Sequence, residues 1–371
     1  MVQELFYGIK KVYNKNGLRG CWNEFLGLVS YKLHLNKLHY QPVDIQIEPT
    51  SKCNLSCIMC GRTYLNRMNG NMNYQNFKKI INQFLYLRFL TLQGLGEPLL
   101  NPDIFKMIKF AKSKGIEVRI SSNATLLTPE NSKKLVSTGL DSIYLSIDGA
   151  SPKTYESIRK GANFDLVINN IEVLMKTKKM LKKDLPRVTL DIVGMRTNLE
   201  EIPKMVKLAH SLGIENVNVR HLYFSLNQRN TINLTKSNEI FSVNSLENES
   251  LFNQNPEKVN TIFKAALKTS NKLGINLHLP SIEPNILKQK EFKCRWPWLH
   301  TYIDFEGNVT PCCICPDKNE ICFGNILNQP FNEIWNSKPY REFRYNIASH
   351  NFPKVCNDCM RPINVFSSFN K

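Results

Sequence analysis

Residues 53–60, CNLSCIMC, place Cys53, Cys57 and Cys60 within eight positions that carry no charge. Thiolates are ligands of zinc and of iron–sulfur clusters, and both sites usually take four of them. Neither a fourth cysteine nor a histidine lies close on either side of this stretch. Three thiolates on a cubane cluster would leave one iron open to an exogenous chelating ligand. The spacing therefore predicts a metal centre that reserves one position for another molecule.

The chain has 11 cysteines, and their distribution separates two thiol sites. Between Cys60 and Cys294 there is none, and seven lie after residue 290. The N-terminus lacks the pattern of a secretory signal, so a reducing, cytoplasmic location is expected. In such a compartment clustered cysteines bind metals more often than they form disulfides.

Alternating strand and helix patterns must position the first thiol site. Apolar and β-branched runs predict strands at 44–48, 88–93, 116–121, 141–147, 187–193 and 215–224. Helical periodicity fills the intervals at 74–86, 102–114, 128–138, 164–182 and 200–212. Thr128 and Pro129 form a helix start, and Gly115 and Gly213 follow helix ends. Such repeats predict parallel strands with the working face at their carboxyl ends, in a partial barrel or an open doubly wound sheet.

The Cx3Cx2C motif on the loop after the first strand resembles the radical S-adenosylmethionine (radical SAM) superfamily. The resemblance covers about residues 40–225 and implies a partial (β/α)6 TIM-like barrel. It implies that Cys53, Cys57 and Cys60 hold a [4Fe–4S] cluster whose open iron binds S-adenosylmethionine. It also implies reductive cleavage of that cofactor to a 5′-deoxyadenosyl radical, with a flavodoxin or ferredoxin as an external electron donor.

Further positions match the family in chain order, and the resemblance assigns them to cofactor binding. The run GLGEP resembles the family's GGEP motif, with Leu95 in place of a glycine; Glu97 suits the methionine ammonium group, and the glycines suit close approach of backbone to the ligand. SSNAT resembles TNG, with Ala124 in place of glycine. The expected cofactor-binding residues are Met59, Gly96, Glu97, Pro98, Ser122, Asn123, Ser146, Asp148 and Arg159.

Substrate-facing groups are expected at the later strand ends. The strand-end rule points to Asp191 on the fifth strand and to Arg220 and His221 on the sixth. Tyr64 follows the cluster loop and is the fourth candidate for a catalytic role.

The order C…Gx4C…CxxC at the other end of the chain resembles the SPASM/twitch extension of some radical SAM enzymes. The resemblance implies one auxiliary [4Fe–4S] cluster held by Cys294, Cys312, Cys356 and Cys359. Structural zinc at this site is an alternative, because four thiolates with a CxxC pair suit Zn²⁺ equally well. A second small metal site made by Cys313, Cys315 and Cys322 is another alternative.

Residues 1–40 read as basic and helical, with a break near Asn16 and Gly17. Packing of their apolar stripe on the following domain is expected, and contact with a membrane surface is the alternative. No run approaches the roughly 18 apolar residues of a membrane span. The net charge of +18 reflects lysines spread along the chain, and no nucleic-acid-binding motif accompanies them.

Four regions are predicted: a helical extension at 1–40, a radical SAM core at 41–225, a linker or lid with a helix at 226–285, and an auxiliary-cluster domain at 286–371. The expected activity is oxidation of a small metabolite such as a sugar or aminocyclitol. Modification of a ribosomal peptide is the second hypothesis, and a zinc-binding interaction protein without catalysis is the third.

Overall fold

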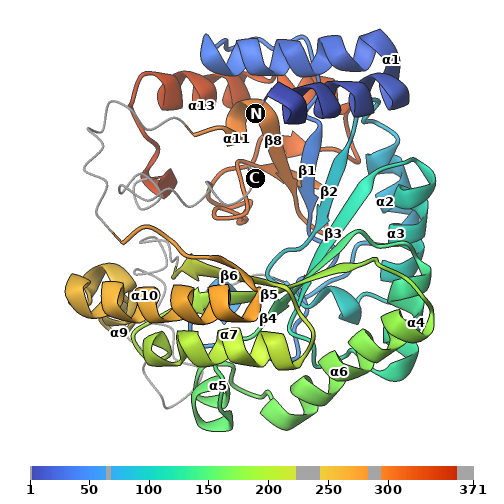
Figure 1. Ribbon diagram of the computed structural model, residues 1–371. Helices are drawn as coiled ribbons and strands as arrows, with labels where there is room; N and C mark the ends of the chain where they lie inside the picture. The colour runs from blue at the N-terminus through green and yellow to red at the C-terminus, as the bar shows by residue number, and fades with distance from the viewer. Residues whose placement is uncertain (1, 64–67, 223–242, 283–293, 357–371) are drawn as a thin grey trace.

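The computed structural model describes residues 2–63, 68–222, 243–282 and 294–356. A curved ten-stranded sheet runs through it in the order β10-β9-β8-β1-β2-β3-β4-β5-β6-β7 (Figure 1). From β1 to β7, and between β1 and β8, neighbouring strands are parallel. The strand–helix repeats allowed either a partial barrel or an open doubly wound sheet, and the curved sheet with helices on its outer face (Figure 1) agrees with the partial barrel that the family resemblance implies.

The six barrel strands fall within about three residues of the expected ranges. The six barrel strands are β1 Asp44–Ile47, β2 Phe89–Leu92, β3 Glu117–Ser122, β4 Ser142–Ser146, β5 Arg187–Gly194 and β6 Asn216–His221. The flanking strands are β7 Asn276–His278, β8 His300–Ile303, β9 Asn308–Thr310 and β10 Gly324–Asn325.

Helices cover the outer face of the curved sheet (Figure 1). They are α2 Tyr74–Ile81, α3 Ile104–Ser113, α4 Pro129–Ser137, α6 Phe164–Met180, α7 Ile202–Ser211 and α10 Pro256–Leu273. The short helix α5, Pro152–Ile158, follows β4 and packs against α6. Thr128 accepts a hydrogen bond from the Asn131 backbone N–H, so the predicted helix cap is present. Gly115 and Gly213 have φ values of 68° and 72°, the left-handed conformation that ends a helix.

The C-terminal region adds its own strands to the barrel edge. β8 and β9 form an antiparallel hairpin, which turns at Gly307 with φ 90°. The pairing of β8 with β1 was not predicted from the sequence. Because the two strands lie side by side in one sheet, the barrel and the C-terminal region share a continuous backbone framework. The remaining helices of this region are α11 Trp296–Leu299, α12 Phe331–Trp335 and α13 Lys338–Ala348.

Alternation along the strands separates an apolar outer face from a more polar inner one. In β5 the buried residues Val188, Leu190 and Ile192 belong to the main apolar core. The alternate positions Thr189 and Asp191 are only partly buried. Since helices occupy the outer face, the second set faces the inside of the barrel.

The N-terminal helix α1, Val2–Lys32, lies across one end of the molecule beside α11 and α13 (Figure 1). Gly17, with φ 60° and ψ −161°, interrupts it at the predicted break. Among the described residues, no helix is long and apolar enough to cross a bilayer.

The described part of the region predicted as a linker or lid with a helix, 226–285, contains a helix besides α10. This additional helix is α9, Val243–Glu249. The Glu249 carboxylate ends this helix and binds Arg196 at 2.9 Å and the Thr197 backbone N–H at 2.9 Å. These contacts to the segment after β5 stabilise a helix that the polar sequence alone did not indicate.

Candidate functional site

The cluster loop, residues 48–60, leaves the carboxyl end of β1 and is held on both sides. On one side the Thr50 hydroxyl donates to the Gly70 carbonyl at 2.9 Å. On the other side the backbone N–H groups of Ser56 and Ile58 donate to the carbonyls of Lys160 and Ile158, each at 3.0 Å. The loop therefore has a fixed path between two distant parts of the barrel.

The three predicted cluster ligands lie together on this loop. Burial raises the pKa of the Cys57 thiol to about 11; Arg159 opposes that shift, and the neighbouring thiols of Cys60 and Cys53 add to it. Burial also raises the pKa of Cys60, with Cys53 again contributing. These contributions indicate that the thiols of Cys53 and Cys60 lie in the neighbourhood of Cys57.

A buried ion pair stands beside these thiols. Arg159 follows α5, and its Nη2 atom lies 2.6 Å from Oδ2 of Asp148, which follows β4. The guanidinium is also within hydrogen-bonding distance of Cys57, with Nη1 3.7 Å from Sγ. The Val193 backbone N–H donates to the other Asp148 oxygen at 2.7 Å. The carboxylate thus fixes a cation against the thiol site.

The donor set fits an iron–sulfur cluster with an anionic ligand beside it. The thiols of Cys53, Cys57 and Cys60 lie on one short loop, and the Arg159 Nε atom beside them is buried without a hydrogen-bond partner among the described residues. An unused N–H on a cation suits a carboxylate, since such charge-assisted hydrogen bonds are short and strong. No three His, Cys, Asp or Glu side chains in the described chain are arranged to hold a single metal ion.

Glu97 connects three strand ends beneath the cluster loop. Its carboxylate is fully buried and accepts hydrogen bonds from the Ser122 hydroxyl at 2.9 Å, the Asn123 backbone N–H at 2.7 Å and the Leu99 backbone N–H at 3.1 Å. Its own backbone N–H donates to the Lys52 carbonyl at 2.8 Å. Burial raises the pKa of Glu97, and these hydrogen bonds oppose the shift. Its expected bond to an ammonium group stays a prediction.

The Asn123 side chain points back to the cluster loop. Its Nδ2 atom lies 4.0 Å from Sγ of Cys53 and 3.0 Å from Oδ1 of Asn54. Ala124 follows in the left-handed conformation with φ 62°, which glycine would adopt without strain. The Ser122 hydroxyl accepts from its N–H, and Asn170 donates to its carbonyl, so local contacts hold the strained residue.

The glycines of the GLGEP run serve contact between two loops. A Cβ added to Gly96 would lie 2.2 Å from the Thr50 carbonyl oxygen and 2.6 Å from that of Lys52. At Gly94 it would lie 2.2 Å from the Glu48 side chain. The sequence suggested that these glycines let the backbone approach a ligand closely. In the structure they let the GLGEP run approach the cluster loop closely.

The other expected cofactor residues surround this centre. Met59 packs with the small apolar cluster of Ile58, Ile158, Met195 and Leu222. Pro98 is buried and begins the 3₁₀ helix Pro98–Leu100. Ser146 ends β4 and lies opposite Asp191 in the sheet. Their contacts with a cofactor stay predictions.

Two of the four candidate catalytic residues pair on the inner wall of the barrel. The Arg220 Nε–H donates to Oδ1 of Asp191 at 2.7 Å, and Nδ2 of Asn218 donates to the same oxygen at 2.8 Å. The Arg220 guanidinium also lies 5.9 Å from the centre of the Tyr144 ring. Because all four residues belong to β4, β5 and β6, rigid strands fix this polar wall.

His221 has a different environment. Its ring stacks on Phe252 with 4.1 Å between centroids, and Nε2 lies 2.8 Å from the Ser281 carbonyl. Burial lowers its pKa. These contacts join β6 to the segment beyond it, so they indicate a structural role. Tyr64 lies outside the described residues.

The second thiol site is assembled from separated segments. Cys294 precedes α11, Cys312 follows β9, and Cys356 lies in the 3₁₀ helix Lys354–Cys356. Burial raises the pKa of Tyr340; Arg344 opposes the shift, and the thiols of Cys312 and Cys294 add to it. The thiols of Cys312 and Cys294 therefore both lie in the neighbourhood of Tyr340. Cys359 lies outside the described residues.

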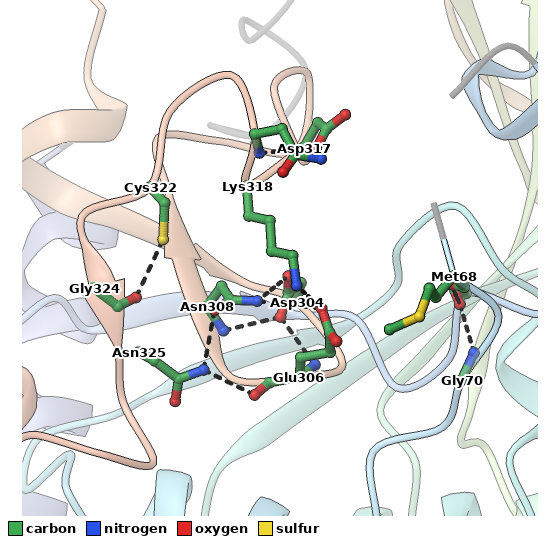
Figure 2. A network of polar contacts seen from close by, with 12 residues as sticks. Met68, Gly70, Asp304, Glu306, Asn308, Asp317, Lys318, Cys322, Gly324 and Asn325 are labelled. Atoms are coloured by element: carbon green, nitrogen blue, oxygen red, sulfur yellow. Dashed lines mark hydrogen bonds and ion pairs between the residues drawn. The ribbon is translucent and has the colours of Figure 1, made fainter. Parts of the chain in front are cut away.

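The additional cysteines occupy different surroundings. The Cys315 N–H bonds to the Cys312 carbonyl, and this forms a tight turn that includes Cys313. Cys322 is exposed, and its sulfur lies 3.5 Å from the Gly324 carbonyl (Figure 2). The same view shows the hairpin turn, where the buried carboxylate of Asp304 accepts from Asn308. No described cysteine forms a disulfide.

Several supporting polar residues were missed by sequence reasoning. The Asn101 side chain donates to the Pro49 carbonyl at 2.6 Å, which holds the start of the cluster loop. Asn198 donates to the Asp148 carbonyl at 3.0 Å. Glu201 accepts from the Ala150 backbone N–H at 2.7 Å and from the Ser151 hydroxyl at 2.8 Å. The Asn and Glu residues follow strand ends, but no local pattern distinguishes them from ordinary loop residues.

Comparison with known families matches each of the two thiol sites to a family of iron–sulfur proteins. A model of the radical SAM superfamily matches residues 47–209, and the SPASM iron–sulfur cluster-binding domain matches residues 294–360. The alternative of a non-catalytic zinc protein is therefore not retained. The two matches indicate a [4Fe–4S] cluster with S-adenosylmethionine in the barrel and an auxiliary iron–sulfur cluster in the C-terminal domain.

Relatives match most of the chain. The AdoMet-dependent heme synthase of Methanosarcina barkeri is 29% identical over 336 residues, 84% of this chain and 89% of that protein. The tungsten-containing aldehyde ferredoxin oxidoreductase cofactor-modifying protein of Pyrococcus furiosus is 26% identical, covering 85% and 86%. The PqqA peptide cyclase of Xanthomonas campestris is 23% identical, covering 86% and 79%.

A solved structure shares the fold. Streptococcus suis SuiB bound to S-adenosylmethionine superposes with a TM-score of 0.63 at 18% identity, covering 86% of this chain and 71% of that one. The sheet order, the gathered thiols and the two family matches agree. The chain belongs to the radical SAM superfamily and carries a C-terminal SPASM domain.

Proposed function

We propose that this protein is a radical SAM oxidoreductase that removes a hydrogen atom from a small polar metabolite, such as a sugar or aminocyclitol, and releases an oxidised product. The observation that carries the substrate class is the wall made by Asp191, Asn218 and Arg220 on the inside of the barrel. Strands hold its hydrogen-bonding groups in place, so it suits a substrate with several hydroxyl or amino groups.

When bound, the cluster and S-adenosylmethionine supply a 5′-deoxyadenosyl radical for hydrogen abstraction, and the auxiliary cluster supplies an electron acceptor. The chain holds and orients these groups. Cys53, Cys57 and Cys60 ligate the first cluster, and Arg159 faces the carboxylate of the cofactor. Glu97 keeps the second and third strand ends in register with the cluster loop.

The SPASM thiols complete the proposal. Cys294, Cys312, Cys356 and Cys359 ligate the auxiliary cluster, and four thiolates leave no iron open for substrate. Loss of a hydrogen atom leaves one unpaired electron on the substrate, so a stable oxidised product requires release of that electron and a proton. An adjacent acceptor meets the first requirement and favours oxidation over isomerisation.

Peptide modification is the second candidate, and the named relatives favour it. The matches include a PqqA peptide cyclase and the mycofactocin maturase MftC of Mycobacterium tuberculosis. The same barrel wall would then contact one side chain of a longer substrate.

Production of 5′-deoxyadenosine tests the chemistry. Anaerobically reconstituted protein with S-adenosylmethionine and dithionite is expected to form 5′-deoxyadenosine, and Cys57→Ala is expected to abolish it. Cys356→Ala should retain that product and lose only auxiliary iron. Equal loss of product in both variants would contradict separate roles for the two thiol sites.

The substrate class requires a second assay. Extract of the source cells is passed through a small-molecule filter, and each fraction is tested for stimulation of 5′-deoxyadenosine formation. Stimulation by the filtrate that survives proteinase treatment supports a metabolite. Stimulation that resides in the retained fraction and disappears after proteinase treatment supports a peptide and overturns the first proposal.

A further inference from the structure

The described part of α1 packs with an inverted pattern of side chains. Its buried positions are Gly20, Asn23, Gly27 and Ser30, all small or polar. A Cβ on Gly27 would lie 3.3 Å from the Tyr40 ring, so small size permits this close packing. The helix therefore docks largely through small and polar residues, and the partly buried Leu26 and Tyr31 also pack against the main apolar core.

Large apolar side chains lie on the opposite side of α1. Leu18 is 76% exposed, Trp22 60%, Phe25 52% and Leu28 48%. The rings of Trp22 and Phe25 stack with 5.3 Å between centroids. Positions i, i+4 and i+7 share one helix face, so these residues form a continuous ridge. Leu33 and Leu35 just beyond the helix are also exposed.

An open cavity of about 640 Å³ lies along this ridge. It is lined by Leu18, Trp22, Phe25, Leu26, His39 and Tyr86, among others. The apolar surface is therefore a ridge with an adjoining hollow and not a set of isolated side chains. Exposed apolar surface of this kind marks a binding site more often than scattered residues do.

The helix that carries the ridge is held rigidly. Asn23 and Gln41 exchange two hydrogen bonds, from Nδ2 to the Gln41 carbonyl at 2.8 Å and from the Gln41 N–H to Oδ1 at 2.9 Å. Glu24 pairs with Arg88 at 2.6 Å. These contacts order the helix before any partner binds, so docking costs little conformational entropy.

The stretch of sequence that carries the ridge is almost entirely positive in charge. Glu24 is the one acidic residue between positions 5 and 43, and its carboxylate is already bound to Arg88. The same stretch contains Lys10, Lys11, Lys15, Arg19, Lys32 and Lys37. The complementary surface is therefore apolar and negatively charged.

We propose that the ridge of Leu18, Trp22, Phe25 and Leu28 binds the surface of a bilayer that contains anionic phospholipid. A helix with aromatic and leucine side chains on one face and a basic fringe is typical of interfacial binding. Tryptophan favours the headgroup level of a membrane, and basic residues are attracted to anionic lipid.

The position of α1 determines how the enzyme sits on the bilayer. Glu24 contacts Arg88, which immediately precedes β2, and Gly27 approaches Leu299 just before β8. These are the amino-terminal ends of the strands, whereas the cluster loop leaves the carboxyl end of β1. The bound protein would therefore direct its cluster loop away from the membrane, so lipid binding and cofactor cleavage can be tested separately.

Flotation with vesicles tests the proposal on the full-length holoprotein. Protein is mixed with vesicles of phosphatidylcholine alone or of equal parts phosphatidylcholine and phosphatidylglycerol. Flotation with the anionic vesicles is expected, together with weaker binding at high salt. The double variant Trp22→Gln/Phe25→Gln should bind at least about tenfold more weakly. Leu166→Gln/Met180→Gln removes two exposed apolar residues from α6 and should bind normally.

If the ridge binds a partner other than an anionic bilayer, the same experiments give different results. No flotation with anionic vesicles overturns the proposal, and so does equal binding by the two double variants. A concentration-dependent dimer that Trp22→Gln/Phe25→Gln abolishes, without flotation, assigns the ridge to a second copy. All variants should form 5′-deoxyadenosine at the rate of the parent protein, which separates this proposal from the proposed function.

Discussion

Arg159 and Asp148 form a buried ion pair, with Nη2 and Oδ2 2.6 Å apart, and the guanidinium also reaches Cys57. The pair joins the segments after β4 and α5 to the cluster loop. Removing the cation beside a buried carboxylate destabilises the folded protein, so the charge of Arg159 supports the fold as well as the cofactor site. Its unused Nε–H identifies the direction in which an anionic ligand is expected.

Substitution of Arg159 separates charge from geometry. Arg159→Lys keeps a cation near Asp148 but loses the planar fork of donors, so the affinity for S-adenosylmethionine should fall by about tenfold. Arg159→Gln leaves Asp148 unpaired and should lower the free energy of unfolding by roughly 3–5 kcal/mol. Equilibrium dialysis and urea unfolding of the reconstituted protein measure the two effects. Arg187→Lys, at a more exposed pair, is the control.

Gly96 should not tolerate a side chain, because an added Cβ meets the Thr50 carbonyl oxygen at 2.2 Å. Gly96→Ala must displace the cluster loop or the GLGEP run, at a cost of about 1–3 kcal/mol, and should reduce bound iron. Gly139→Ala is the matched control. Its added Cβ meets only Lys112 at 4.0 Å, so it should lose about 1–2 kcal/mol from its left-handed φ and retain full iron. Full iron content in Gly96→Ala would contradict the expected loop contact.

Strand positions were predictable because alternation and β-branched runs are local signals. The ranges expected for β1 to β6 agree with the structure within about three residues, and Thr128 caps the helix as its type indicates. The pairing of β8 with β1 was not predictable, because it joins segments about 250 residues apart and leaves no periodic pattern. The GLGEP motif was also recognisable, but its glycines contact the cluster loop, a relationship that spacing alone does not give.

The sequence also did not reveal several supporting polar residues, because their side chains hydrogen-bond to backbone groups that are distant in the chain. Asn101 supports Pro49, and Asn198 supports Asp148, through carbonyl groups far away in sequence. Polar residues in loops are common, so composition does not separate such supports from solvent-exposed neighbours. The inverted burial of α1 was missed for a similar reason. Its apolar periodicity predicted a stripe against the domain, whereas Gly27 allows the small face to pack closely against Tyr40 and Leu299.

Arg220 is expected to act on substrate and not on cofactor cleavage. Arg220→Lys breaks the Nε contact with Asp191, so the extract-dependent stimulation of 5′-deoxyadenosine formation should fall about tenfold or more. The slow formation without extract should be unchanged. Arg196→Lys alters a more exposed Arg–Glu pair and should leave both rates intact. Equal loss of both rates in Arg220→Lys would place Arg220 in the cofactor site instead.

Asp44 and His300 should give opposite pH dependences of stability. Burial raises the pKa of Asp44 from 3.8 to about 7, although Arg119 opposes the shift. Between these values the unfolded chain releases a proton that the native state keeps, so stability falls as pH rises from about 4 to 7. Burial lowers the pKa of His300 from 6.5 to about 4. Here the unfolded chain binds the extra proton, so stability falls as pH drops from about 6.5 to 4.

Single substitutions should reveal each slope. In Asp44→Asn only the histidine effect remains, so the free energy of unfolding should rise more steeply with pH between about 4 and 6.5 than in the parent protein. In His300→Gln only the Asp44 effect remains, so the slope of the free energy of unfolding against pH should be lower over the same range than in the parent protein. Anaerobic urea unfolding of the holoprotein at several pH values measures both slopes. Lys106→Gln, at an exposed pair with Asp103, is the control and should preserve the parent profile. Parallel profiles for Asp44→Asn and His300→Gln would show that neither group keeps its shifted pKa in the folded protein.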